Sequence, residues 1–531
     1  MPPARETDVL IIGAGHNGLV CAYYLAARGL KVTMLERRSI VGGAAVTEEF
    51  HPGFRNSTAS YTVSLLNPKV VRDMRLYEHG LKVVLRKVDN FLPTLGTDHL
   101  LSGRGGLTRR EIARHSRADA EGYDAYSAAL GSVVGLLRDW ILRAPPNAGG
   151  GLADVLAALK LGNSVRGMTL EEQRNLVDFF TKSAADILER YFTTDIVQAL
   201  FGFDAVVGNY ASPYDSGSAY VLLHHLFGEA AGVAGAWGHA IGGMGAITQA
   251  MARACREKGV EIILDAPVEE ILAERGRAAG AVAGGKVWRA KAVAANVNPH
   301  FLFGSLLPEG AVAPEIARRM AGWAAESATF RMNVALSELP RFTSLPEPGD
   351  HLTAGIILAP SLGYMDRAYT SARTEGWARE PIVEMLLPST LDDSLAPAGA
   401  HVASLFCQHF PYEVEGGWEA RADEAADHII AHVDRYAPGF EASVVGRLAL
   451  SPWHLEQRFG IPRGDIFHGK MGLDQLFSSR PMLGHADYRM PLAGLYLCGS
   501  GAHPGGGVTG APGHNAARAI LADRRKWKGT A

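Results

Sequence analysis

The sequence predicts an α/β fold in which helices cover a buried parallel sheet, on three observations. Residues 8–12 form an apolar run that is typical of a buried strand, and residues 17–28 continue as a helix that Gly29 ends. Residues 31–36 form a second strand, which completes a strand–helix–strand unit. Another buried strand is predicted at residues 495–498, close to the other end of the chain.

The chain between these ends mixes helices and strands. Residues 116–142 and about 170–200 have helical patterns, and residues 144–151, rich in Pro and Gly, mark an exposed loop. Further helices are predicted from the glycines at 242–245 to Lys258, and from about Gly513 to Arg525. The remaining strand candidates are residues 260–264, 268–272, 286–297, 329–336, 382–387 and 401–409.

Composition excludes several classes of protein. The chain has 531 residues, with 52 Lys and Arg against 55 Asp and Glu, and no long run of one charge that would form a nucleic-acid groove. The four cysteines are scattered without a CxxC pair, so we expect neither a bound metal nor a dithiol centre. Neither a secretory signal nor a membrane span is visible, which predicts a cytoplasmic protein with at most peripheral membrane contact. The oligomeric state stays open.

A glycine motif joins the first strand to the first helix. In Gly13-x-Gly15-x-x-Gly18, Gly13 permits a tight turn, Gly15 lets a pyrophosphate approach the backbone, and Gly18 lets helix and strand pack closely. Asn17 lies inside the motif, and Glu36 ends the second strand, where its carboxylate can accept hydrogen bonds from ribose hydroxyls. The motif therefore predicts a dinucleotide site, although NAD and FAD sites share it.

A second glycine turn favours FAD over NAD. Gly42-Gly43 follows Glu36 closely and leads into Ala44-Ala45. Such a pair lets the chain turn back beneath the pyrophosphate and bring further backbone donors to a long cofactor. A plain surface turn is the alternative interpretation.

A third glycine-rich loop precedes the last helix, at residues 499–510. It begins with Gly499-Ser500 and contains Gly507-Val508. Its backbone N–H groups suit the ribityl chain and the N1–C2=O edge of a flavin, where negative charge collects on reduction. A flexible linker is the alternative, but the loop's place between a buried strand and a helix argues against it.

With these motifs the sequence resembles the phytoene desaturase-like FAD-dependent oxidoreductases, within the amine oxidase and glutathione reductase-2 type group. It is most similar to the branch named pyridine nucleotide-disulfide oxidoreductase domain-containing protein 2. The resemblance rests on the first glycine motif and on residues 42–49, 52–54, 242–245 and 503–508.

The resemblance implies a Rossmann-like FAD-binding domain of that type and a discontinuous, mixed α+β substrate domain. We assign residues 1–86, 240–298 and 481–531 to the FAD-binding domain. Residues 87–239 and 299–480 form the predicted substrate domain.

The resemblance also implies further site residues. The backbone of Val268 is expected to touch the adenine, and residues 56–61, which include Ser60, are expected to border the flavin together with residues 503–508. Where the wider group usually has an arginine after the glycine pair, this chain has Ala44, so Arg37 or backbone donors must serve the phosphates.

A second departure concerns the ribityl chain. The usual Gly-Asp of the group reads Gly499-Ser500 here, which puts one ribityl hydrogen bond in doubt.

These observations predict an enzyme that transfers hydride between a lipophilic small molecule and N5 of a flavin. His503, inside the last glycine loop, is the candidate catalytic residue, with a loop-stabilising hydrogen bond as its alternative role. For Tyr61, Trp237 and His239, core packing is the more natural interpretation. Two other functions stay open: an NAD-dependent dehydrogenase, and a non-redox lipid-binding or chaperone-like protein on the same fold.

Overall fold

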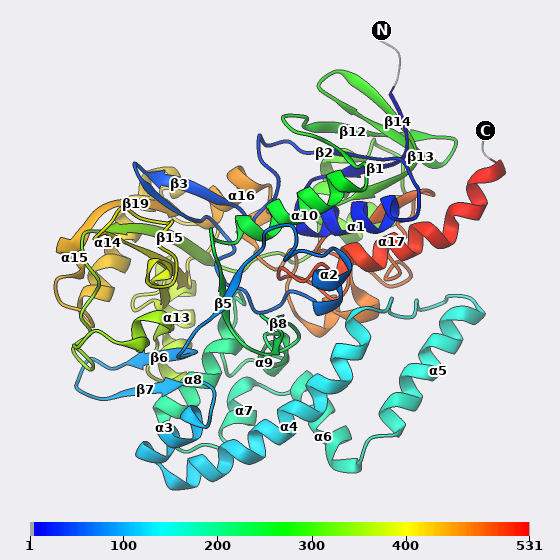
Figure 1. Ribbon diagram of the computed structural model, residues 1–531. Coiled ribbons are helices and arrows are strands. Elements are labelled where there is room, and N and C mark those ends of the chain that lie inside the picture. The colour runs from blue at the N-terminus through cyan, green and yellow to red at the C-terminus, as the bar shows by residue number, and fades with distance from the viewer. Residues whose placement is uncertain (1–4, 530–531) are drawn as a thin grey trace.

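The computed structural model describes residues 5–529, which form two lobes, each built on a seven-stranded sheet, and a helical region beside them (Figure 1). The first sheet has the order β11-β2-β1-β14-β13-β12, and β20 pairs with the second half of β14. Its strands are β1 (Arg5–Ile12), β2 (Val32–Leu35), β11 (Glu261–Ile263), β12 (Val268–Glu274), β13 (Arg277–Ala283), β14 (Lys286–Ala295) and β20 (Leu495–Leu497).

The centre of the first sheet is parallel. β1 runs parallel to β2 and to β14, and β11 and β20 extend the parallel part on either side. The α/β fold predicted from the sequence is confirmed. We keep the predicted domain boundaries as a proposal, although all strands of this sheet fall within 1–86, 240–298 and 481–531.

Three helices pack together against the first sheet. α1 (His16–Ala26) lies between α10 (Gly245–Glu257) and α17 (Ala511–Asp523), as Figure 1 shows. Buried side chains of all three helices join those of β1 in one core, so the parallel strands read as continuous apolar runs.

The second lobe is built on the sheet β19-β15-β18-β17-β16-β6-β7, in which only β16 and β6 are parallel neighbours. The predicted strands at 329–336, 382–387 and 401–409 are confirmed as β15, β17 and β18. The strands are β6 (Asn90–Pro93), β7 (His99–Ser102), β15 (Thr329–Leu336), β16 (Gly355–Leu358), β17 (Ile382–Leu386), β18 (His401–Gln408) and β19 (Val444–Leu450).

Short strands and helices connect the two lobes. The short strands are β3 (Thr47–His51), β4 (Phe54–Ser57), β5 (Val83–Leu85), β8 (Glu229–Ala230), β9 (Val233–Ala234) and β10 (Gly238–Ala240). The helices outside the helical region are α2 (Pro68–Asp73), α11 (Pro299–Phe301), α12 (Pro314–Ala321), α13 (Leu362–Glu375), α14 (Trp418–Asp434), α15 (Phe440–Ser443) and α16 (Pro452–Phe459).

The helical region corrects two predictions. The single helix expected at 170–200 is three helices, because Ser183 and Asp186 form a capping box that starts a new helix after a break. A helix at 152–166, which the sequence analysis missed, has no buried residue and presents Leu152 to solvent. The helices are α3 (Leu107–His115), α4 (Arg117–Ile141), α5 (Leu152–Arg166), α6 (Leu170–Thr181), α7 (Ala184–Leu188), α8 (Asp195–Val206) and α9 (Ala219–His224).

β13 was also missed, because its Ala- and Gly-rich sequence has low strand propensity. It is held by antiparallel pairing with β12 and β14. Tertiary pairing therefore overrides local preference there.

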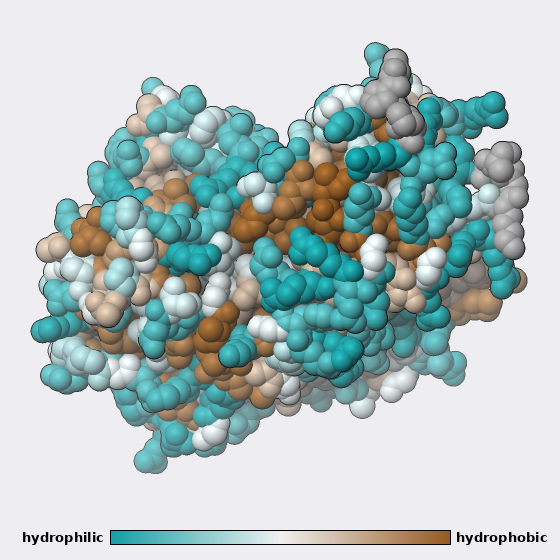
Figure 2. Space-filling view, turned by 45° about the horizontal axis from the view of Figure 1, so that its top comes forward, coloured by the Kyte–Doolittle hydropathy of each residue, from teal (hydrophilic) through white to brown (hydrophobic). Residues whose placement is uncertain are grey.

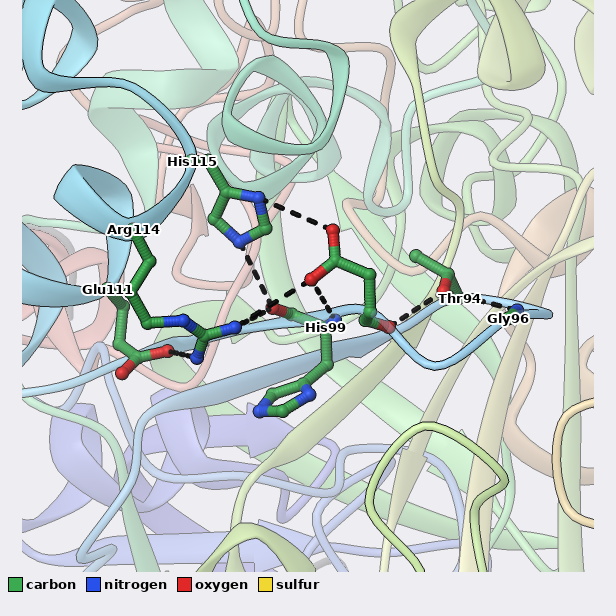
Figure 3. Close-up of polar contacts among 7 residues, drawn as sticks. Thr94, Gly96, His99, Glu111, Arg114 and His115 are labelled. Atoms are coloured by element: carbon green, nitrogen blue, oxygen red, sulfur yellow. Dashed lines mark hydrogen bonds and ion pairs between the residues drawn. The ribbon is translucent and has the colours of Figure 1, made fainter.

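A polar cluster fastens the β6–β7 hairpin to α3 (Figure 3). Nε2 of His115 bonds the carbonyl oxygen of His99 at 3.1 Å, and its Nδ1 lies 3.5 Å from Asp98. Arg114 pairs with Glu111 at 2.6 Å. Arg114 and Asp98 are exposed, and within residues 5–529 no group of three or more His, Cys, Asp and Glu could hold a metal ion. The cluster is a structural tie.

The surface is hollowed between the two lobes. Figure 2 shows hydrophobic residues gathered as a band in this hollow, with hydrophilic residues on both sides. In the described part of the chain, no helix has the length and hydropathy needed to cross a membrane.

Candidate active site

The first glycine motif forms a tight turn at the carboxyl end of β1. The N–H of Gly13 donates to the Leu35 carbonyl at 2.8 Å, and Nδ2 of Asn296, just beyond β14, donates to the Gly13 carbonyl at 3.2 Å. A Cβ on Gly18 would stand 2.3 Å from the Gly13 carbonyl oxygen. Only glycine allows this contact between the helix and the turn.

Glu36 fixes the same turn from the end of β2. Its Oε2 accepts the N–H of Ala14 at 2.7 Å, and its Oε1 accepts the N–H of Arg38 at 3.0 Å. The side chain is 5% exposed. The carboxylate therefore orders the loop. Glu36 also lines the cleft described below.

The second glycine turn lies against the first. The N–H of Gly42 donates to the Ala14 carbonyl at 2.9 Å, and a Cβ on Gly43 would approach Cα of Gly15 to 3.3 Å. Gly42 has φ +129°, and a Cβ there would be 2.6 Å from the Ala45 carbonyl oxygen. Gly42 and Gly43 thus form a tight turn that packs against the first glycine motif, and a turn is what their sequence predicted.

The third glycine-rich loop reaches the same place from the other end of the chain. Nδ2 of Asn17 donates to Oγ of Ser500 at 3.1 Å, and Nε2 of His16 bonds the Gly507 carbonyl oxygen at 3.2 Å. Because burial lowers the pKa of His16 to about 4, its ring is neutral at pH 7. Three segments far apart in the sequence therefore converge.

A cleft opens where these segments meet, with about 1140 Å³ of empty space when the open solvent at its mouth is included. Its wall also includes the end of α16 and the segment after β14. The predicted residues that line it are Gly13, Gly15, Asn17, Glu36, Arg37, Gly42, Gly43, Ala44, Val268, Gly499 and Ser500.

The cleft has polar atoms ready for a bound molecule. Among residues 5–529, Oδ1 of Asn17, Nη1 of Arg38 and Nδ2 of Asn298 are buried without a hydrogen-bond partner, and all three residues line the cleft. Buried polar atoms are rarely left unpaired. Together with a backbone cradle that side chains at the glycines would fill, they fit a dinucleotide.

The sequence analysis expected Arg37 or backbone donors to contact the phosphates, and the neighbouring Arg37 and Arg38 make different contacts at the cleft. Nη2 of Arg37 donates to the Arg458 carbonyl at 2.7 Å, so this guanidinium holds the end of α16. Arg38 pairs with Glu48 at 2.7 Å and keeps Nη1 unpartnered in the described part of the chain. Arg38, which the sequence analysis did not select, therefore has one donor left for a molecule bound in the cleft.

A second cavity adjoins the cleft, with about 1060 Å³ of empty space when open solvent is included. Its walls are mainly apolar and come from both lobes, with Leu65 and Val207 among them. The predicted residues Ala44, Ala45, Ser60, Ser500, Gly507 and Val508 line it. The residues that line both spaces are His16, Ala44, Ile461, His468 and Ser500.

The surface of this cavity is mainly apolar, although the hydroxyl residues Ser60, Thr62 and Ser64 also line it. The hydroxyl of Tyr61 donates to Oε2 of Glu384 in a short hydrogen bond, and both residues line the cavity. His225 also lines it, and burial lowers the pKa of His225 to about 4. Burial raises the pKa of Glu384, which the nearby Arg86 opposes.

His503 does not line either space. Its ring packs against Phe477 with centroids 5.4 Å apart, and Nε2 bonds the Trp140 carbonyl oxygen at 3.4 Å. These contacts match the alternative role of His503, a hydrogen bond that holds the loop, and its catalytic role stays an untested prediction. Gly18 also lines neither space, since it lies in the packing of α1 against the turn.

Sequence reasoning missed Asn296, Ile461, His468, His225 and Glu384. A signal existed for Asn296 alone, because ligands of parallel sheets bind beyond the carboxyl ends of the strands, and Asn296 directly follows β14. The others come from segments that carry no local motif. His239 and Trp237 were assigned to packing; Trp237 lines the cavity, whereas Nε2 of His239 contacts Asp392 at 3.2 Å.

Comparison with known proteins gives consistent relatives. The family model of the NAD(P)-binding Rossmann-like domain matches residues 11–75. The pyridine nucleotide-disulfide oxidoreductase domain-containing protein 2 of Rattus norvegicus is 39% identical, over 98% of this chain and 94% of that protein. The neurosporene-forming phytoene desaturase of Cereibacter sphaeroides is 24% identical (98% and 95%), and the lycopene-forming phytoene desaturase of Pseudescherichia vulneris 25% identical (94% and 96%).

Solved structures share the fold. An oxidoreductase from Methanosarcina mazei has a TM-score of 0.61 at 15% identity, over 97% of this chain and all of that one. Cyclohexylamine oxidase from Brevibacterium oxydans has a TM-score of 0.58 at 16% identity, over 98% and 99%. At such identities these matches show the architecture alone.

Proposed function

Since the chain belongs to the family of pyridine nucleotide-disulfide oxidoreductase domain-containing protein 2, a branch of the phytoene desaturase-like oxidoreductases, we propose that it is an FAD-dependent dehydrogenase of a lipophilic small molecule. One observation carries the proposal. The cleft that fits a dinucleotide and the apolar cavity share His16, Ala44 and Ser500, so a long cofactor in the cleft would end at the cavity.

Bound FAD would supply a hydride acceptor, a chemistry that protein side chains lack. The glycine turns and Glu36 would hold its adenosine and pyrophosphate, and Asn17 and Ser500 would hold the ribityl region. The apolar walls of the cavity exclude water and orient the carbon that loses hydride. For an unactivated carbon, such positioning is the main contribution of the protein.

Thiol chemistry contributes nothing to this function, despite the family name. All four cysteines, Cys21, Cys255, Cys407 and Cys498, are free and buried. A hydrogen bond with Cys498 and burial raise the pKa of Cys21, and burial raises the pKa of Cys255 and Cys407. Protonated, inaccessible thiols are poor nucleophiles.

The two other functions make different predictions. An NAD-dependent dehydrogenase has no use for the turn at Gly42, which lies against the first glycine motif, or for the loop at residues 499–510. A lipid-binding protein without redox activity would need the cavity but no intact phosphate cradle. The packed glycines at both turns therefore favour the flavoenzyme.

Absorbance of the purified protein tests the proposal. We expect flavin bands at about 370 and about 450 nm and release of FAD on denaturation. Anaerobic light with an electron donor should bleach the longer band, and lipophilic donors should then be screened for the same bleaching. A folded, colourless protein that takes up no added FAD contradicts the proposal. Bound flavin that cannot be reduced supports the lipid-binding alternative.

A further inference from the structure

We propose that the apolar cavity binds a lipophilic molecule carrying one neutral hydroxyl group, which Tyr61 and Glu384 hold. The inference deepens the proposed function and rests on it for the reaction that follows. Polar atoms of Tyr61 and Glu384 lie together at one part of the largely apolar cavity wall. Tyr61 follows β4, Glu384 lies on β17, and Phe406 on β18 stacks near the Tyr61 ring at 5.3 Å.

Burial raises the pKa of Glu384, and the charges of the buried Arg86 and Arg331 oppose that effect. The guanidinium carbon of Arg331 lies 4.6 Å from the centroid of the Tyr61 ring, and Nη2 of Arg86 donates to Oγ1 of Thr62 at 2.6 Å. Arg86, Arg331 and Glu384 are all at most 3% exposed. The hydroxyl of Tyr61 donates to Oε2 of Glu384.

The orientation of this bond decides what the cavity offers a ligand. Because the Tyr61 proton points to Glu384, its oxygen presents lone pairs to the cavity. His225, 6% exposed, has no partner for Nε2 among residues 5–529, while its ring bonds the Asp204 backbone. A ring nitrogen that donates to a carbonyl leaves the other nitrogen of a neutral histidine as an acceptor.

The wall offers the acceptors of Tyr61 and His225 together with the hydroxyls of Ser60, Thr62 and Ser64, so it suits a ligand group that both donates and accepts a hydrogen bond. A hydroxyl group can donate to Tyr61 or His225 and stays uncharged among apolar residues. A carboxylate would be desolvated beside the carboxyl group of Glu384, and an ammonium would be desolvated beside Arg86 and Arg331. An ether or a hydrocarbon would leave the acceptors unpaired, which weakens binding.

Calorimetric titration of the purified protein with its bound cofactor tests the inference. The probes are 1-octanol, methyl heptyl ether and octanoate, which match in size. We expect 1-octanol to bind most tightly. Tyr61→Phe should lower its affinity about three- to tenfold, the usual weight of one hydrogen bond, and leave the ether unchanged.

The matched control is Tyr364→Phe. Its hydroxyl is also buried and donates to the Pro381 carbonyl at 2.9 Å, but it lies outside the cavity. This variant should keep the preference for 1-octanol. Glu384→Gln preserves side-chain shape and should lower the preference for 1-octanol. If Tyr61→Phe does not fold, the affinities of Glu384→Gln for the alcohol and the ether test the inference instead.

Tighter binding of octanoate, or an equal loss for alcohol and ether in Tyr61→Phe, overturns the inference. The same measurements distinguish a failure of this inference from a failure of the proposed function. A colourless protein that still prefers 1-octanol keeps the hydroxyl site but loses the flavoenzyme. Flavin that lipophilic donors reduce, with no preference for the alcohol, keeps the flavoenzyme and removes the hydroxyl site.

Discussion

The dinucleotide cleft and the apolar cavity adjoin each other, yet they are built by different means. The cleft is made by backbone turns, in which Gly15, Gly42 and Gly43 bring main-chain groups together. The cavity is made by side chains such as Val207, which follows helix α8, and Phe406, which lies on β18. Backbone sites tolerate few residue types and so leave motifs in a sequence, whereas an apolar wall can be built from many combinations.

The largest expected effect is on the cleft, from Gly15→Val. A Cβ at this position would already stand 2.9 Å from Nδ2 of Asn296, and the branched side chain would fill the space for the pyrophosphate. We expect the affinity for FAD to fall by more than about 100-fold, as measured by flavin content and FAD titration. Gly131→Ala, at an open position on α4, is the control. A yellow, folded Gly15→Val protein would place the cofactor elsewhere.

Glu36→Ala should have a smaller effect on the same cleft. It removes the acceptor of the Ala14 N–H and the predicted partner of the ribose hydroxyls, but leaves the glycine turns intact. We expect FAD to bind about tenfold more weakly, the order of one or two hydrogen bonds to a charged group. A loss as large as that of Gly15→Val would mean that the carboxylate, and not the backbone, dominates the cleft.

Val207→Phe should affect the cavity and spare the cleft. Val207 is 7% exposed and lines the cavity but not the cleft, so a larger ring takes volume from the ligand. We expect the affinity for 1-octanol to fall about fivefold with unchanged FAD content, since overfilling a packed wall costs about 1 kcal/mol or more. A parallel loss of FAD would show that the two spaces are not separable.

The smallest effect is expected from His503→Gln. The amide can replace the bond to the Trp140 carbonyl, and the residue lines neither space. Turnover and FAD content should change less than about twofold, within the range of one neutral hydrogen bond. A loss of turnover with intact flavin would support the predicted catalytic role of His503.

The difference between a cleft made by backbone turns and a cavity made by side chains explains how much of the site could be predicted from the sequence. The glycine motifs predicted the fold, the convergence of both chain ends, and the backbone turns of the cleft. Glu384 and His225 could not be found, because they sit in segments whose local pattern is that of ordinary buried residues. His503 was selected for its position in a glycine loop, but the loop turns its ring toward Phe477.

Helix boundaries show a related limit. Residues 170–200 have one continuous helical pattern, yet Ser183 offers its hydroxyl to the N–H of Asp186 at 3.0 Å and starts a second helix. The choice between continuing and capping depends on packing around the break. The pattern therefore predicted the helical character of this region and missed its division.

The central claim is that the cleft and the cavity form one site around a single flavin. The most direct measurement is the absorbance difference spectrum of the FAD-bound protein during titration with 1-octanol, beside calorimetry on the same sample. We predict a shift of the band at about 450 nm that saturates together with the heat of binding. Heat of binding without any change in the flavin spectrum would show that the ligand and the cofactor do not meet.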